Sequence, residues 1–305
     1  MASPTGTTDA PFGRMLTAMV TPFTPNGEVD YAAVRRLATY LVDEQRNDGL
    51  IVNGTTGESP TTSDDEKQRI VSAVVEAVGD RATVVAGAGT NDTRHSVELA
   101  KQAARADAHG LLVVTPYYNK PPQEGLYRHF SAVADATGLP VMLYDIPGRS
   151  GVPIKTETLI RLAQHDRIVA VKDAKGDLFG ASQVMISTDL AFYSGDDLLN
   201  LAWLSLGAAG FVSVVGHVVG AELARMIRLF QSGDVEEARA INSQLAPVVD
   251  GIMLRAGGAI MAKAALGMVG MPVGPVRLPL VEATEKQIAE LRACLVAGGV
   301  KLTDA

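Results

Sequence analysis

Short runs of Val, Ile and Leu alternate with longer amphipathic segments from residue 14 to about residue 230. The short runs predict strands and the segments of helical period predict helices, for example over residues 31–44, 65–78 and 93–105. When every strand is followed by a helix, the strands run parallel and the helices form the crossovers. The predicted strands cover residues 16–20, 50–53, 83–86, 111–115, 141–144, 168–172, 191–194 and 211–214.

Two α/β folds are built from such units, an open doubly wound sheet and a closed barrel. The open sheet binds dinucleotides through G-x-G-x-x-G after its first strand, but the nearest segment here, residues 87–92, follows the third strand and lacks the third glycine. We therefore predict a (β/α)8 TIM barrel over residues 13–233. Residues 1–12 are expected to be a loose tail, and residues 234–305 a small helical domain with helices over 235–254, 258–266 and 285–295.

Residues 198–221 contain no Asp, Glu, Lys or Arg, and 24 residues are long enough to span a bilayer. Four glycines divide this stretch into a helical piece, a strand and a new helix, and acidic rather than basic residues flank it. We expect barrel elements here rather than a membrane span.

The composition limits the classes of function that the chain can have. The 305 residues carry a net charge of -7, which argues against a nucleic-acid partner and favours small-molecule substrates. The single cysteine, Cys294, cannot form an internal disulfide, so a reducing compartment such as the cytoplasm is expected.

The catalytic groups of a barrel lie at the carboxyl ends of its strands. Lys172 ends the strand over 168–172, and the period of two places it on one face with Ile168 and Ala170, toward the barrel mouth. Desolvation favours the neutral amine of a lysine, which is a nucleophile for carbonyl carbon. The alternative is a lysine whose ammonium reaches solvent from a strand end.

Residues with hydroxyl groups lie at or just after the ends of other strands, and three of these residues are Tyr144, Thr55 and Tyr118. Schiff-base chemistry needs proton transfers when water is lost and when an aldehyde oxygen is protonated, and hydroxyl groups can relay those protons. Each tyrosine could instead be a packed aromatic. The turn over 54–58 offers backbone N–H groups that could bind a carboxylate, and the alternative is a purely structural turn. Arg149 could bind a second carboxylate, and the alternative is a solvated surface arginine.

These motifs resemble the pyruvate-dependent class I aldolase family of N-acetylneuraminate lyase and dihydrodipicolinate synthase, over nearly the whole chain. The resemblance rests on Gly-Thr-Thr-Gly-Glu-Ser at 54–59, Thr-Pro-Tyr-Tyr-Asn-Lys-Pro at 115–121, residues 144–149, Lys172 and Ser-Gly-Asp-Asp at 194–197. It implies the synthase reaction, in which pyruvate condenses with L-aspartate 4-semialdehyde on the way to diaminopimelate and lysine. No metal or organic cofactor is implied.

The resemblance also implies roles for individual residues. Lys172 would form the Schiff base with pyruvate, and the other positions would relay protons or bind substrate. A homotetramer of two tight dimers is implied, in which Tyr118 serves the site of the neighbouring subunit. The implied relay consists of Thr55, Tyr144 and Tyr118, and the implied substrate contacts are Thr56, Gly195, Val212 and Arg149, the last for the semialdehyde carboxylate.

The family's lysine feedback site is implied at the tight dimer interface. Ser59, Asn91 and Tyr117 match it, whereas His95 replaces a glutamate that binds the amino groups of the inhibitor. Loss of a carboxylate weakens binding of a cationic ligand, so we predict weak or absent inhibition by lysine.

Three rival functions are open to such a chain. A related Schiff-base aldolase could act on a sugar acid or on 4-hydroxy-2-oxoglutarate, and chiefly Arg149 argues against it. A keto-acid sensor would not need the proton relay. A metal-dependent aldolase is disfavoured because the five histidines lack ligand spacing.

Overall fold

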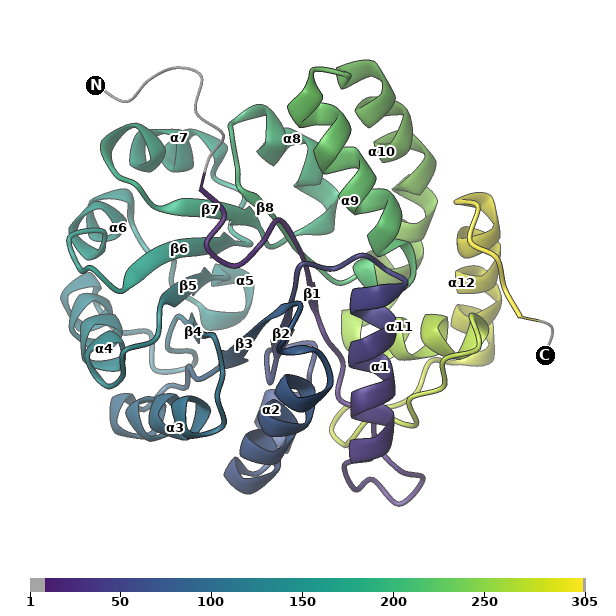
Figure 1. Cartoon of the computed structure of the whole chain (residues 1–305), viewed down its shortest axis with the longest axis horizontal. Coiled ribbons are helices and arrows are strands. Elements are labelled where there is room, and N and C mark those ends of the chain that lie inside the picture. Colours follow the sequence, from purple (N-terminus) through teal and green to yellow (C-terminus); the bar gives the residue numbers. More distant parts are fainter. Residues whose placement is uncertain (1–8, 304–305) are drawn as a thin grey trace.

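The predicted barrel is confirmed by a computed structural model, which describes residues 9–303. Within these residues, parallel strands follow one another in chain order around a closed barrel, and β8 pairs with β1 to complete it (Figure 1). Each strand end lies within two residues of its prediction. The strands are β1 (Met15–Ala18), β2 (Gly49–Val52), β3 (Thr83–Gly87), β4 (Gly110–Val114), β5 (Val141–Asp145), β6 (Ile168–Asp173), β7 (Ala191–Ser194) and β8 (Gly210–Ser213).

Helices connect the strands and surround the barrel (Figure 1). Local sequence explains where they begin: at α2, for example, the Ser63 hydroxyl accepts the Glu66 N–H and the Glu66 carboxylate accepts the Ser63 N–H. The helices and short turns of the barrel are α1 (Tyr31–Asp43), η1 (Ser59–Thr61), α2 (Asp64–Val78), α3 (Thr93–Arg105), α4 (Gln123–Asp135), α5 (Pro147–Ser150), α6 (Thr156–Leu162), α7 (Leu178–Ser187), η2 (Asp197–Leu199), α8 (Asn200–Ser205) and α9 (Gly216–Ser232).

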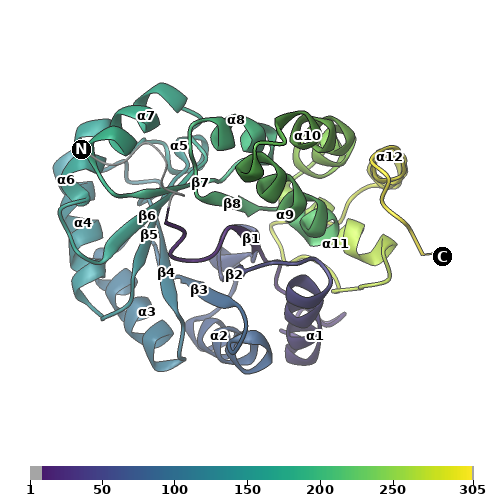
Figure 2. The ribbon, with the colours of Figure 1, turned by 45° about the horizontal axis from the view of Figure 1, so that its top comes forward.

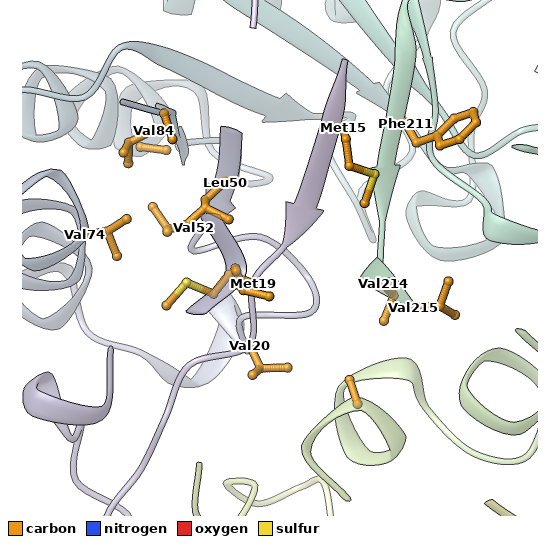
Figure 3. Packing of buried hydrophobic residues seen from close by; sticks show 14 of the residues in the cluster. Met15, Met19, Val20, Leu50, Val52, Val74, Val84, Phe211, Val214 and Val215 are labelled. Atoms are coloured by element: carbon orange, nitrogen blue, oxygen red, sulfur yellow. The ribbon is translucent and has the colours of Figure 1, made fainter. Parts of the chain in front are cut away.

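The hydrophobic core has two layers because alternate strand residues point to opposite faces. Outside the barrel, Val74 of α2 faces Leu50 and Val52 of β2 (Figure 3). Inside it, a second cluster fills the space between the strands, so the barrel is packed rather than hollow. Its members include Leu16, Ile51, Val85, Leu112, Met142, Ala170, Ala191 and Val212.

Phe12 closes the amino-terminal mouth of the barrel. Its side chain is fully buried in the interior cluster, and its N–H donates to the Tyr193 hydroxyl at 3.4 Å. That hydroxyl in turn donates to the Gly13 carbonyl at 2.9 Å. With this end closed, the carboxyl ends of the strands are left for a site. The first eight residues of the predicted loose tail lie outside the described residues.

The remaining helices lie at one side of the barrel, where α10 packs on α9 (Figure 2). They are α10 (Val235–Val249), η3 (Asp250–Leu254), α11 (Gly258–Met268) and α12 (Glu285–Ala297). The prediction of one helix over 235–254 is wrong at its carboxyl end. Pro247 has no N–H to donate within α10, the helix ends two residues later, and the chain continues in the wider turn η3.

The uncharged stretch over 198–221 is divided as predicted. It contains most of η2, then α8, strand β8 and the beginning of α9. Among the described residues, no helix combines the length and the hydropathy needed to cross a membrane.

The burial of His217 is expected to make the free energy of unfolding depend on pH. It is fully buried, its Nε2 accepts the Val20 N–H at 3.1 Å, and its Nδ1 therefore carries the proton donated to the Val214 carbonyl at 2.7 Å. Burial lowers the pKa of His217 from 6.5 to about 4. Because the unfolded chain takes up this proton first, stability falls by about 3 kcal/mol as the pH drops from 6.5 to 4.

Urea unfolding of wild type and of His217→Gln between pH 4 and 8 measures this contribution. The variant is expected to be less stable at pH 7 and to lose less stability on acidification. Burial raises the pKa of Asp145 to about 6, which acts with the opposite sign, but it does so in both proteins. Equal slopes in wild type and His217→Gln would contradict the prediction, and the partly exposed His165, changed to Gln, serves as the control.

Candidate active site

Lys172 is the last residue but one of β6 and lies inside the barrel, with Tyr144 of β5 and Tyr193 of β7 beside it in register. Only 4% of its surface is exposed. Its predicted face is confirmed by Ala170, which belongs to the interior cluster, but the prediction for Ile168 is wrong. A register shift between β5 and β6 lies between Ile168 and Ala170, so Ile168 packs outside the barrel.

The amine of Lys172 contacts an aromatic ring, and its alkyl chain lies against a glycine. Nζ lies 4.1 Å from the centre of the Tyr144 ring. A Cβ at Gly195 would lie 2.8 Å from Lys172 Cγ, so only glycine leaves room for the lysine here. Gly195 is itself fixed, because its N–H donates to the Asp173 carbonyl at 2.7 Å. Val212 of β8 completes this part of the barrel interior.

Thr55 and Thr56 lie in the tight turn that follows β2. The turn is fixed by hydrogen bonds: Thr21 Oγ1 donates to the Gly57 carbonyl at 2.6 Å, and the Glu58 N–H donates to the Thr55 carbonyl at 3.1 Å. Thr56 is buried and Thr55 is partly exposed. The predicted turn is therefore present.

Two residues from the segment after the barrel hold this turn. The buried Glu58 carboxylate lies 2.7 Å from Lys263 Nζ of α11 and accepts the Arg277 N–H at 2.8 Å. Arg277 also binds Glu66 of α2 at 2.5 Å and lowers the pKa of that carboxyl to about 2. The strand-end pattern does not reveal this contact because its partners lie some 200 residues apart in the sequence.

A cavity of about 340 Å³ opens at the carboxyl ends of β2 to β5. It brings together four of the predicted catalytic and substrate-binding residues, Thr55, Tyr118, Tyr144 and Arg149. Lys172 is not among the lining residues but contacts the ring of Tyr144, which is. Thr56, Gly195 and Val212 do not line the cavity either.

Arg149 and Tyr118 stand at the rim of this cavity. Arg149 lies on the short α5, directly after β5, and its exposed guanidinium forms no ion pair with any residue that the structure describes. Tyr118 is 86% exposed and has a left-handed backbone, with φ of 73°. That conformation is strained for a tyrosine.

The residues of the implied feedback site are divided between the cavity and the surface. Ser59 and Tyr117 line the cavity, and burial raises the pKa of the Tyr117 hydroxyl. Asn91 is exposed after β3, and its carbonyl accepts from Asn119 at 2.9 Å. His95 lies on α3 with Nε2 2.9 Å from Asp64 Oδ2, so the histidine faces a carboxylate.

Asp145 and Lys175 form an ion pair that sequence patterns do not reveal. Lys175 Nζ lies 3.3 Å from Asp145 Oδ2, close to Tyr144 and Lys172 in the chain. The two residues belong to separate strand-end motifs, and only the adjacency of β5 and β6 could have suggested that they meet.

Comparison with known proteins identifies similar chains. The model of the dihydrodipicolinate synthetase family matches residues 11–297. The 4-hydroxy-tetrahydrodipicolinate synthase 2 of Streptomyces coelicolor is 63% identical over 98% of this chain and 100% of its own length. The 4-hydroxy-tetrahydrodipicolinate synthase of Acidothermus cellulolyticus is 62% identical over 95% of this chain and 94% of its own. A crystal structure of the Cyanidioschyzon merolae enzyme with lysine bound superposes with a TM-score of 0.93, at 44% identity over 96% of this chain and 100% of that one.

Proposed function

Because the chain belongs to the dihydrodipicolinate synthetase family, we propose that it condenses pyruvate with L-aspartate 4-semialdehyde through a Schiff base on Lys172. The product is 4-hydroxy-tetrahydrodipicolinate, the first committed intermediate of diaminopimelate and lysine biosynthesis. The observation that carries the proposal is a buried lysine at a strand end in contact with Tyr144, beside a cavity that Thr55 and Arg149 also line.

The reaction begins with attack of the neutral Lys172 amine on C2 of pyruvate. The carbinolamine loses water to give the imine, and loss of a proton from the methyl group gives the enamine. The enamine carbon then forms a bond to the aldehyde carbon of the second substrate, whose oxygen takes up a proton. The amino group of that substrate finally attacks the imine carbon, which closes the ring and releases the Lys172 amine.

Hydroxyl groups move the protons in these steps. Tyr144 lies beside the reacting nitrogen, since its ring contacts the Lys172 amine, and Thr55 lines the same cavity as Tyr144. Tyr118 of a neighbouring subunit completes the relay. The buried Thr56 binds the pyruvate carboxylate, while the backbones of Gly195 and Val212 form the floor of the pyruvate site.

Pyruvate consumption by the purified protein, with and without L-aspartate 4-semialdehyde, tests the reaction. Turnover that depends on the semialdehyde is expected. Turnover only with sugar-aldehyde acceptors would contradict the synthase assignment and favour a related aldolase.

Arg149 is expected to set affinity for the semialdehyde. A guanidinium binds a carboxylate through charged hydrogen bonds, so Arg149→Ala should raise the KM for the semialdehyde by about tenfold or more. The KM for pyruvate should stay within about twofold of wild type, because pyruvate binds at Lys172. Steady-state kinetics against each substrate measure both values. A proportional rise in both KM values would contradict this role, and Arg36→Ala, on the exposed face of α1, is the matched control.

We extend the proposal to a homotetramer of two tight dimers. The exposed Tyr118 supports a tight dimer in which the tyrosine enters the neighbouring site. On α7, Phe179 is 76% exposed and Ile186 is 87% exposed, and their spacing of seven places them on one face. This face supports a second contact between dimers. We also place the reaction in the cytoplasm, where the single Cys294 would stay reduced.

Lysine is expected to inhibit weakly or not at all. His95 stands beside Asp64 and offers no second carboxylate to the amino groups of a cationic inhibitor. Initial rates at increasing lysine concentration measure the effect, and His95→Glu is expected to strengthen inhibition. Clear inhibition of the wild type at submillimolar lysine would contradict the prediction.

A further inference from the structure

Three charged residues are enclosed at the adjacent ends of β5 and β6. Asp145 and Asp173 face each other in register and are 0% and 1% exposed. The side chain of Lys175, in the loop after β6, is 14% exposed. Burying a charge is costly unless the charge is paired and hydrogen-bonded. The contacts of these three residues therefore indicate which segments the cluster joins.

The contacts of Asp145 and Lys175 converge on one residue, Ile154. Its N–H donates to the Asp145 carboxylate at 3.2 Å, and its carbonyl accepts from Lys175 Nζ at 3.2 Å. The ion pair between Asp145 and Lys175, at 3.3 Å, closes the triangle. Both polar groups of the Ile154 backbone are thus fixed by the pair.

Residues 145–154 form the segment that carries Arg149. Within it, the Ser150 hydroxyl lies 3.1 Å from the Ile146 carbonyl and 2.9 Å from the Val152 carbonyl, which braces α5 internally. The segment begins at Asp145 and returns to the same carboxylate at Ile154. The position of this segment is therefore set by the Lys175 ammonium, which binds both the Asp145 carboxylate and the Ile154 carbonyl.

The other end of the connection reaches Lys172. Asp173 directly follows Lys172, and its Oδ1 accepts the backbone N–H groups of Lys175 and Gly176, each at 2.8 Å. The loop that carries the Lys175 ammonium is thereby held to the strand that carries the nucleophile. A continuous set of contacts runs from Lys172 through Asp173, Lys175 and Ile154 to the segment of Arg149.

We propose that Lys175, through its bonds to Asp145 and Ile154, is a positioning residue that fixes Arg149 relative to Lys172 and so sets affinity for the second, carboxylate-bearing substrate. The inference rests on the proposed function, because it takes Lys172 as the nucleophile and Arg149 as the carboxylate ligand. Lys175 itself touches neither substrate in this account.

Kinetics of Lys175→Met test the inference. The KM for the semialdehyde is expected to rise by about tenfold, while the KM for pyruvate and the yield of borohydride-trapped pyruvate adduct stay within about twofold of wild type. Lys155→Met, an exposed lysine next to Ile154, is the matched control and should match wild type in all three measurements.

The double variant Asp145→Asn/Lys175→Met separates positioning from stability. Each single change leaves a buried charge without its partner, whereas the double variant removes both charges. We expect its melting temperature to lie above that of either single variant, with the KM for the semialdehyde still raised. An unchanged KM for the semialdehyde in both Lys175 variants would overturn the inference. An equal rise in the KM for both substrates in the well-folded double variant would also overturn it. If the wild type itself shows no semialdehyde-dependent turnover, the proposed function fails and the inference fails with it.

Discussion

The Lys172→Ala variant is expected to lose turnover by on the order of 10⁴-fold or more. No other amine contacts the Tyr144 ring within the described residues, so the imine with pyruvate has no alternative nucleophile in the site. Lys172→Arg should lose as much, because a guanidinium stays protonated and does not attack a carbonyl.

Semialdehyde-dependent pyruvate consumption measures this loss, and thermal melts establish that the variants fold. Lys155→Ala, which removes an exposed lysine, should retain wild-type rates. Retention of more than about a tenth of wild-type turnover in folded Lys172→Ala would assign the nucleophile elsewhere.

Tyr118→Phe is expected to lower kcat by about 10²-fold or more, because it removes one hydroxyl of the proton relay and keeps the ring. In one subunit the Tyr118 side chain is 86% exposed, and in the proposed tight dimer it serves the site of the neighbouring subunit. Tyr127→Phe, a partly buried tyrosine of α4, is the control and should keep wild-type kcat.

Co-expression of Tyr118→Phe with Lys172→Ala tests the sharing of this tyrosine. In a hybrid dimer, the subunit with intact Lys172 would receive intact Tyr118 from its partner. Random pairing then restores about a quarter of wild-type activity, since half of the dimers are hybrid and each has one complete site of two. A mixture no more active than the average of its two inactive parents would show that Tyr118 acts within its own chain or not at all.

Local patterns were sufficient to predict the barrel and the neighbourhood of Lys172. The alternation of strands and helices specifies parallel neighbours in chain order, and this order predicts that Tyr144 lies beside Lys172. Capping residues such as Ser63 placed helix starts to within one residue. These features are encoded within a few residues of the elements that they define.

Contacts that depend on exact register or on distant segments were not predictable in this way. The irregularity near Ile168 changes which residues point inward, and no period of two reveals it. The ion pairs of Glu58 with Lys263 and of Asp145 with Lys175 join separate motifs, and their charges look like ordinary solvated groups in the sequence. The place of Tyr118 after a strand makes it a candidate hydroxyl group, and only the structure reveals its exposure.

The most direct test of the account is to trap the covalent intermediate. The protein is incubated with pyruvate and sodium borohydride, digested, and mapped by mass spectrometry. The peptide containing Lys172 is expected to gain the mass of pyruvate less one water plus two hydrogens, and Lys172→Ala is expected to gain none. An adduct on another lysine, or turnover without any trapped adduct, would contradict it.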